Sequence, residues 1–322
     1  MENTALNILV LEGGGSKGVY TIGLLKELEK ALGAPLYKHF GLIYGTSTGS
    51  IIGALIALGH SMESIEQLYL ALVPKIMTPK TRSGKSKVLL DETQKVFKGL
   101  TFEDFKTNIG IVAMDYETQM PIIFKTDQIQ SNGDLAGYGC TIAQAVRSSC
   151  SAYPFFEKIK LKTEKLGAIN VVDGGFIANN AVLYSIADAS NVLGIKTSNM
   201  HLLNIGVGHY TEQTSGIFPR IIKRIGLFTF IERVLRANTN SNLMVSQLLF
   251  PNLNMVRISE SFLDPIHGTF MFEADVQKLE GMLQLGRRSY LKNEQEILNL
   301  IQQNTEFING SSPFNEELKI GS

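Results

Sequence analysis

The chain has few cysteines and no excess of charge of either sign. Its 322 residues include only Cys140 and Cys150, too few for a disulfide framework, and neither lies near a pair of histidines at a metal-ligand spacing. Thirty basic and thirty acidic residues cancel, so no overall field favours a nucleic acid polymer as a partner. The sequence therefore predicts neither a metal site nor a cofactor, and it predicts no nucleic acid partner.

Long apolar runs are also missing. No run approaches the ~18 residues needed to span a bilayer, and the N-terminal stretch MENTALNILVLEGGG has neither a basic n-region nor a long apolar h-region. Hydrophobic residues make up 44% of the chain and charged residues 19%, a balance that predicts a globular protein with a sizeable core. We therefore expect a reduced, cytoplasmic location, with any membrane contact peripheral.

The most informative stretch is a serine framed by glycines, where a strand pattern changes to a helix pattern. FGLIY at residues 40–44 is typical of a short strand, and the run IIGALIAL that follows is typical of a buried helix. Ser47 therefore lies at a nucleophile elbow, in which Gly45 and Gly49 avoid clashes with the strained serine backbone. The turn exposes the hydroxyl and places the Thr48 N–H at a helix N-terminus, where it stabilises a developing oxyanion.

A second glycine-rich loop separates a predicted strand at residues 6–11 from a predicted helix at residues 20–32. The loop contains Gly13, Gly14, Gly15, Lys17 and Gly18. This spacing also matches the dinucleotide fingerprint, but the strand that should end in a ribose-binding carboxylate ends in Gly-Thr-Ser-Thr-Gly. We interpret the loop as an oxyanion hole whose Gly14 and Gly15 N–H groups face the substrate carbonyl oxygen, with Lys17 supplying positive charge or a structural contact.

A carboxylate is available as a partner for the serine. Asp173 is followed by Gly174 and Gly175 and comes directly after a predicted strand at residues 168–172. An aspartate before two glycines is most often a turn, but α/β folds collect their functional groups at the carboxyl ends of strands. We therefore select Asp173 as a second candidate site residue.

The same two residues also allow another arrangement, a Ser–His–Asp triad. Ser47, Asp173 and then His201 or His209 follow the chain order of the α/β-hydrolases. That fold places its elbow after several strands, whereas one predicted strand precedes the strand of the elbow here.

The remaining hydrophobic patterns predict further helices at residues 60–72, 89–100, 141–147 and 275–302, and strands at 108–114, 120–125, 192–195 and 201–207.

Two segments of the chain are rich in basic residues. We predict that residues 74–88, with lysines and an arginine at 75–87, form a mobile basic loop. Contact with lipid headgroups or a phosphorylated regulator is the functional alternative for this loop. Gly-Lys-Ser at 84–86 resembles the end of a P-loop, but no strand precedes it. Residues 219–238, basic at 220–236, predict an amphipathic helix that packs on the core or contacts a membrane or second subunit.

Three motifs occur in one order: GGGSKG at 13–18, GTSTG at 45–49 and DGG at 173–175. This pattern resembles the patatin-like phospholipases, and the likeness extends to AVRSSCSAYPFF at 145–156 and to the Asn179-Asn180 pair. Glu12 stands where the family often has aspartate, and Lys17 where it often has arginine. The resemblance implies a three-layer α/β fold, with a mainly parallel central sheet flanked by helices. It further implies a catalytic core at 1–215 and a helical C-terminal part at 216–322 packed on the same domain.

The resemblance also implies an activity. A lipid acyl hydrolase of the phospholipase A type would use Ser47 as nucleophile and Asp173 as general base, without histidine, metal or cofactor. Some bacterial patatin-like proteins of this size are membrane-degrading effectors of antiviral signalling, switched on by a cyclic nucleotide. The implied partners are thus phospholipid, the inner membrane surface, a cyclic nucleotide activator and a second copy of the chain. The alternatives are a triad carboxylesterase acting on neutral lipids and a catalytically silent binding protein with the same fold.

Overall fold

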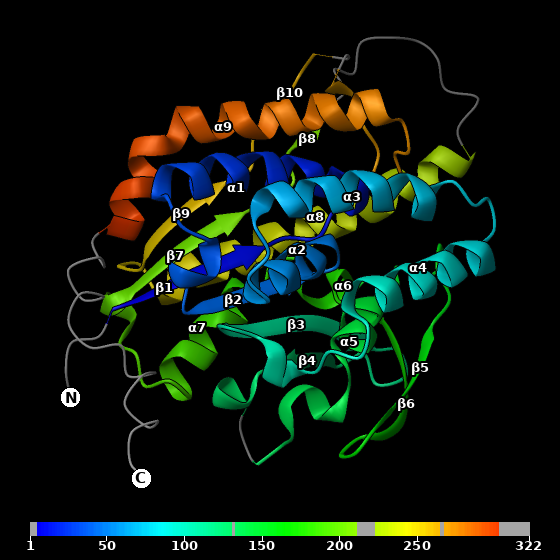
Figure 1. Cartoon of the computed structure of the whole chain (residues 1–322), viewed down its shortest axis with the longest axis horizontal. Helices are drawn as coiled ribbons and strands as arrows, with labels where there is room; N and C mark the ends of the chain where they lie inside the picture. The colour runs from blue at the N-terminus through cyan, green and yellow to red at the C-terminus, as the bar shows by residue number, and fades with distance from the viewer. Residues whose placement is uncertain (1–4, 131–132, 211–222, 265–266, 303–322) are drawn as a thin grey trace, which may run out of the picture.

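The computed structural model describes residues 5–130, 133–210, 223–264 and 267–302. Its centre is an eight-stranded sheet in the order β5-β6-β3-β2-β1-β7-β9, with β4 paired to β3 (Figure 1). These strands are β1 (Leu6–Leu11), β2 (Leu42–Thr46), β3 (Asn108–Asp115), β4 (Pro121–Lys125), β5 (Ile159–Thr163), β6 (Gly167–Asp173), β7 (Met200–Ile205) and β9 (Asn254–Ile258). A separate two-stranded ribbon pairs β8 (His209–Tyr210) with β10 (Ser261–Phe262).

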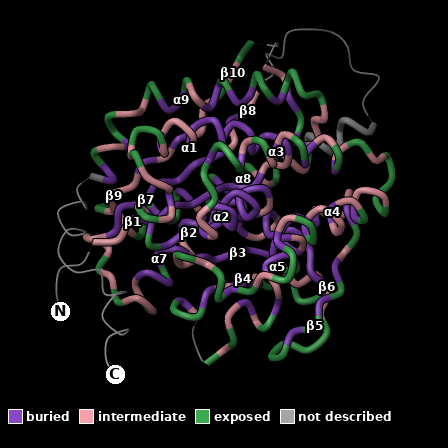
Figure 2. The backbone as a smooth tube through the Cα atoms, viewed as in Figure 1, coloured by how far each residue is buried: buried purple, intermediate pink, exposed green. Residues whose placement is uncertain are grey.

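The middle of the sheet is parallel. β1 pairs in parallel with β2 and β7, β2 with β3, and β7 with β9, whereas β4 and β6 run antiparallel to β3. Parallel strands covered on both faces are continuous apolar runs, and LNILVL of β1 is such a run, buried over nearly its whole length. Figure 2 shows this buried centre.

Helices cover both faces of the sheet. They are α1 (Gly18–Leu32), α2 (Thr48–Ala57), α3 (Met62–Met77), α4 (Arg82–Phe97), α5 (Ile142–Ser149), α6 (Gly175–Ala178), α7 (Val182–Asn191), α8 (Lys223–Leu249) and α9 (Val276–Gln302). One apolar core joins the sheet to α1, α2, α3, α5 and α9, and another joins it to α6, α7 and α8. The fold is therefore a three-layer α/β arrangement with a mainly parallel sheet, as predicted.

Two predictions of local structure are wrong. Residues 74–88 are not a loop: α3 continues to Met77, and α4 begins at Arg82 after the Thr81 hydroxyl accepts a hydrogen bond from the Gly84 N–H. Lys75 pairs with Glu92 of α4, so part of the basic charge is used within the fold. Residues 192–195, expected to be a strand, follow the end of α7 as turn and irregular chain.

The C-terminal third contributes to the sheet as well as to the helical layers. β9 extends the sheet beside β7, and α9 packs along α1 (Figure 1). Neither β9 nor β5 was predicted, because neither is a long apolar run: β5 alternates buried and exposed residues. Residues 219–222 of the predicted basic helix lie outside the described residues, and α8 continues eleven residues beyond the predicted end at 238. Within the described residues, no helix is both long and apolar enough to cross a bilayer.

Candidate active site

The elbow links β2 to α2. Its serine, Ser47, has φ 52° and ψ −122°, a strained conformation that residues with a side chain rarely adopt. A Cβ on Gly45 would lie 2.5 Å from the Gly49 carbonyl oxygen, and a Cβ on Gly49 would lie 2.2 Å from the Leu11 carbonyl oxygen. Both positions therefore require glycine, because the turn approaches itself and β1 too closely for a side chain.

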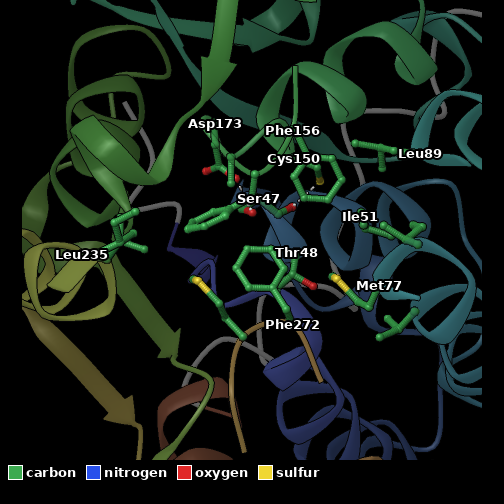
Figure 3. A pocket seen from close by; sticks show the side chains of 18 of the residues that line it. Ser47, Thr48, Ile51, Met77, Leu89, Cys150, Phe156, Asp173, Leu235 and Phe272 are labelled. Atoms are coloured by element: carbon green, nitrogen blue, oxygen red, sulfur yellow. Dashed lines mark hydrogen bonds between the residues drawn. The ribbon is translucent and has the colours of Figure 1, made fainter. Parts of the chain in front are cut away.

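Ser47 and Asp173 contact each other directly. Ser47 Oγ donates a hydrogen bond to Asp173 Oδ2 at 2.6 Å (Figure 3). The other carboxylate oxygen, Oδ1, accepts a hydrogen bond from the Gly175 N–H at 2.7 Å. The serine hydroxyl is thus already aligned with a group that can take its proton, and both carboxylate oxygens are held in place.

The register of the sheet explains how residues 126 positions apart meet. Thr46, the last residue of β2, pairs with Val112 of β3. The next residue of β3, Ala113, pairs with Asp173 at the end of β6. We expected Asp173 at the site because the carboxyl ends of parallel strands lie at one edge of a sheet. That rule does not explain why Asp173 lies beside Ser47, because β6 runs antiparallel to β3. β3 brings the ends of β2 and β6 together from opposite directions.

Asp173 is buried, and burial changes its acidity. Desolvation raises the pKa of Asp173 from 3.8 to about 6, although the hydrogen bonds from Ser47 and Gly175 lower it. A carboxylate with an ordinary pKa is a weak base, and a higher pKa brings it closer to the proton affinity that general-base catalysis needs. A buried aspartate with this raised pKa is therefore better suited to general-base catalysis than an exposed one.

The glycine loop lies beside the elbow. Gly14 and Gly15 line the same pocket as Ser47. Neither of these two N–H groups has a hydrogen-bond acceptor among the residues that the structure describes, whereas the Gly13 N–H donates to the Asn179 carbonyl at 3.4 Å. Gly14 and Gly15 can therefore donate to an oxygen of a bound substrate.

The other predicted loop residues support this arrangement. Gly15 has φ +58°, and a Cβ there would lie 2.1 Å from the Met271 carbonyl oxygen. Gly18 begins α1 and packs against Thr48, and Gly174 packs against the β3 backbone. Thr48 is the first residue of α2, so its N–H has no partner within the helix and lies beside Ser47.

Lys17 does not present a free charge to the pocket. Its side chain is buried, and Nζ pairs with Glu232 Oε1 of α8 at 3.0 Å. Of the two predicted roles of Lys17, the structure shows the structural contact. This ion pair connects the glycine loop to a helix more than two hundred residues away in the sequence.

The pocket around the dyad is lined mainly by apolar side chains. Figure 3 shows several of them converging on Ser47. They come from α2, α3, α4, α8 and two loops, and include Ile51, Leu72, Ile76, Leu89, Phe156, Leu235 and Phe272. Such a lining suits a long hydrocarbon chain and keeps water away from the reacting groups.

A family model described as patatin-like phospholipase matches residues 9–186. The match covers more than half of the chain and includes both glycine motifs, Ser47 and Asp173. The chain belongs to the patatin-like phospholipase family. It is therefore a serine hydrolase with phospholipase activity on the α/β fold described above.

Relatives of this patatin-like phospholipase include bacterial enzymes named for their activators. A protein from Escherichia coli named cUMP-AMP-activated phospholipase is 40% identical over 294 residues, which are 90% of this chain and 92% of the relative. Another, from Escherichia coli strain TW11681 and named cGAMP-activated phospholipase, is 26% identical over 230 residues, 64% of this chain and 63% of the relative. The crystal structure of VipD from Legionella pneumophila aligns with a TM-score of 0.45 and 12% identity, over 95% of this chain and 75% of VipD. The family assignment rests on the sequence matches.

The two candidate histidines of the phospholipase contact other groups. His201 Nδ1 lies 2.8 Å from the Leu300 carbonyl oxygen, and His209 Nε2 lies 2.8 Å from Ser261 Oγ. Neither ring has a hydrogen bond to Ser47 or Asp173 among the described residues. The structure does not assemble the alternative Ser–His–Asp triad.

A segment that the sequence analysis did not assign a role holds the backbone of Ser47. Ser149 Oγ accepts a hydrogen bond from the Ser47 N–H at 2.8 Å and donates one to the Val112 carbonyl at 2.6 Å. The Ser47 carbonyl accepts from Ser50 Oγ at 2.6 Å and from Cys150 Sγ at 3.2 Å. The N–H and the carbonyl of Ser47 thus both have side-chain hydrogen-bond partners.

The same segment also positions Asp173. The Asp173 N–H donates to the Ser151 carbonyl at 3.0 Å. Residues 149–151 therefore form hydrogen bonds with the backbone of both Ser47 and Asp173. The stretch lies within the AVRSSCSAYPFF motif, which the sequence analysis gave only as part of the family resemblance.

We expect the acid limb of the pH–rate profile to report on Asp173. Because the carboxylate must be unprotonated to accept the serine proton, kcat/KM for a soluble ester should fall about tenfold per pH unit below about pH 6. The limb should persist in His209→Ala, since that ring does not contact the dyad. A profile that is flat down to pH 5, or a limb that disappears with His209, would contradict this assignment.

We expect Ser149→Ala to lower kcat about tenfold to a hundredfold with little change in KM, because a misplaced nucleophile costs rate rather than binding. Ser148→Ala is the matched control: its hydroxyl is buried in the same turn and has no partner among the described residues. Ser149→Thr, which keeps the hydroxyl, should recover part of the rate. Equal losses in Ser148→Ala and Ser149→Ala would mean that the segment acts through packing alone.

Proposed function

We propose that the protein cleaves acyl esters of glycerophospholipids, as a phospholipase A, through an acyl-enzyme formed on Ser47. The observation that supports this most strongly is the 2.6 Å hydrogen bond from Ser47 Oγ to a buried Asp173 in an apolar pocket. The family match supports the lipid class of the substrate. The mechanism follows from the positions of the groups.

In the first half-reaction, Ser47 Oγ attacks the ester carbonyl carbon and its proton passes to Asp173 Oδ2. The carbonyl oxygen becomes an oxyanion that accepts hydrogen bonds from the Gly14, Gly15 and Thr48 N–H groups. Removal of one such donor costs ~3–4 kcal/mol in other hydrolases. When the tetrahedral intermediate collapses, the lysophospholipid leaves as an alcohol after taking the proton from Asp173, and the acyl group stays on Ser47.

In the second half-reaction, Asp173 accepts a proton from a water molecule that attacks the acyl-enzyme. The same N–H groups stabilise the second oxyanion. Collapse of this intermediate returns the proton to Ser47 Oγ and releases the fatty acid. Each half-reaction uses Asp173 once as base and once as acid, so the dyad is regenerated.

We further propose that this activity is regulated and acts at a membrane. A relative at 40% identity is named for activation by cUMP-AMP, and others are named for activation by cGAMP. By this likeness, the enzyme responds to a cyclic dinucleotide and degrades the inner membrane from its cytoplasmic side as an effector of antiviral defence. A homo-oligomer is the form we propose for the active state.

The test is fatty acid release from phosphatidylglycerol and phosphatidylethanolamine vesicles, with and without cyclic UMP–AMP. We expect release that the cyclic dinucleotide increases. Hydrolysis of a short soluble ester without any release from phospholipid, in either condition, would exclude phospholipid as the substrate. Equal release with and without the nucleotide would exclude this activator.

A further inference from the structure

The outer face of α8 carries an apolar stripe that no other part of the described structure covers. Along one side of the helix, at alternating steps of four and three residues, lie Phe230, Val234, Ala237, Ser241, Met244 and Leu248. Residues at these steps lie on one face of a helix. Phe230, Met244 and Leu248 are 62%, 63% and 70% exposed, and Val245 and Leu249 widen the stripe at its end. Large apolar side chains exposed along one face of a helix, here interrupted by Ser241, indicate an interaction site.

The opposite face of α8 is committed to the fold and to the active site. Ile231 and Leu235 line the catalytic pocket, and Figure 3 shows Leu235 on the Asp173 side of it. Leu243 is buried in the core beneath the sheet, and Asn238 Nδ2 donates to a carbonyl of α6 at 3.1 Å. α8 therefore separates the pocket from whatever lies against the stripe.

The charges on this helix all have one sign at its exposed surface. Arg233 and Arg236 are exposed beside the stripe, and residues 233–249 contain no aspartate or glutamate. Glu232, which precedes them, is engaged by Lys17. The outer face is thus apolar and cationic, a combination typical of helices that lie in the interface of an anionic bilayer.

We propose that the outer face of α8 is the surface through which the enzyme lies on an anionic phospholipid bilayer. The proposal rests on the proposed function, because phospholipid is the substrate there. The stripe lies among the headgroups, with α8 parallel to the membrane plane, and Arg233 and Arg236 contact lipid phosphates. Since α8 also forms a wall of the pocket, docking on this face places that wall of the active site at the membrane surface.

Self-association through the same stripe is disfavoured by its borders. Helices that pair through residues at alternating three- and four-residue steps usually carry opposite charges on the flanking positions. Here the flanking charges are Arg233 and Arg236 without an acidic counterpart on the exposed face. A bilayer that contains phosphatidylglycerol supplies the negative charge that a second copy of α8 lacks.

The experiment compares Met244→Ser/Leu248→Ser with a matched control, Val276→Ser/Leu291→Ser, which removes two exposed apolar side chains from α9. Binding to mixed phosphatidylethanolamine and phosphatidylglycerol vesicles is measured by co-sedimentation, with and without cyclic UMP–AMP. We expect the α8 variant to bind about tenfold or more weakly, as two apolar side chains lose their burial, and the control to bind like wild type. Both variants should hydrolyse a short soluble ester at the wild-type rate, because neither pair lines the pocket.

A charge variant tests the second half of the proposal. Arg233→Gln/Arg236→Gln should bind phosphatidylglycerol-containing vesicles about tenfold or more weakly, at roughly 1 kcal/mol per arginine, and should bind pure phosphatidylcholine vesicles like wild type. Unchanged vesicle binding by the α8 apolar variant, or no binding by wild type in either condition, would overturn the proposal. So would a change of oligomeric state in light scattering without a change in binding. Failure of the proposed function would give another result: the protein would bind the vesicles but release no fatty acid from them.

Discussion

Ser47→Ala is expected to release fatty acid from phospholipid about 10⁶-fold more slowly than the wild-type enzyme, the scale of loss when a serine nucleophile is removed from other hydrolases. Alanine keeps the elbow but removes the only atom that forms the acyl-enzyme. A water molecule cannot replace the Ser47 hydroxyl at the wild-type rate. The hydroxyl already lies 2.6 Å from Asp173 before substrate arrives, whereas a water molecule has to be positioned there first. The loss should appear in kcat and should be the same for phospholipid and for a soluble ester.

Labelling with a fluorophosphonate probe provides an independent measurement. Wild type should be labelled and Ser47→Ala should not, whether or not the activator is present. His209→Ala should be labelled and should retain activity, since its ring contacts Ser261 rather than the dyad. Activity of Ser47→Ala within tenfold of wild type would show that another residue is the nucleophile.

Asp173→Asn is expected to lower kcat by about 10²–10⁴-fold, the range for loss of a general base. Asparagine has nearly the same shape and can still accept the hydrogen bond from the Gly175 N–H, so the loop should remain in place. It cannot take the serine proton. The acid limb near pH 6 should disappear together with the rate, and a variant that keeps both would contradict the assignment of Asp173 as the base.

The same substitution should stabilise the protein at neutral and alkaline pH. The folded-state pKa of Asp173 is raised from 3.8 to about 6, so the folded protein holds a proton that the unfolded chain releases between these values. Stability therefore falls as pH rises through this window, by about 2–3 kcal/mol. Asparagine carries no charge to bury, so thermal unfolding at pH 8 should occur at higher temperature in Asp173→Asn, with the difference shrinking toward pH 4. A lower melting temperature at pH 8 would exclude this explanation.

Much of the fold could be predicted because its strongest signals are local. β1 coincides with the predicted run at 6–11, and β3, β6 and α9 differ from prediction by one or two residues at their ends. These elements are long, apolar on the faces they bury, and bounded by clear stop signals. The errors fall where local signals are weak or conflict, as in the basic stretch at 74–88. Most of this stretch belongs to the end of α3 and the start of α4, and α4 packs against α3 and α5.

The elbow itself could be predicted from seven residues. The close approach of Gly45 to the Gly49 carbonyl lies within this short stretch, whereas the close approach of Gly49 to Leu11 of β1 comes from the tertiary structure. The glycine loop is similar, since a strand, a flexible loop and a helix together produce free N–H groups. The three motifs in their order were therefore enough to predict the family and the two members of the dyad.

What the sequence determined by itself is the set of chemical groups and the local turns that expose them. Only the tertiary structure decided that β6 would deliver Asp173 from the antiparallel direction, that Ser149 would hold the Ser47 N–H, and that Lys17 would pair with Glu232. These contacts join residues that are distant in the chain, and they depend on which elements become neighbours and in what register. The same is true of the pKa of Asp173, because the desolvation that raises it comes from packing by segments distant in the chain.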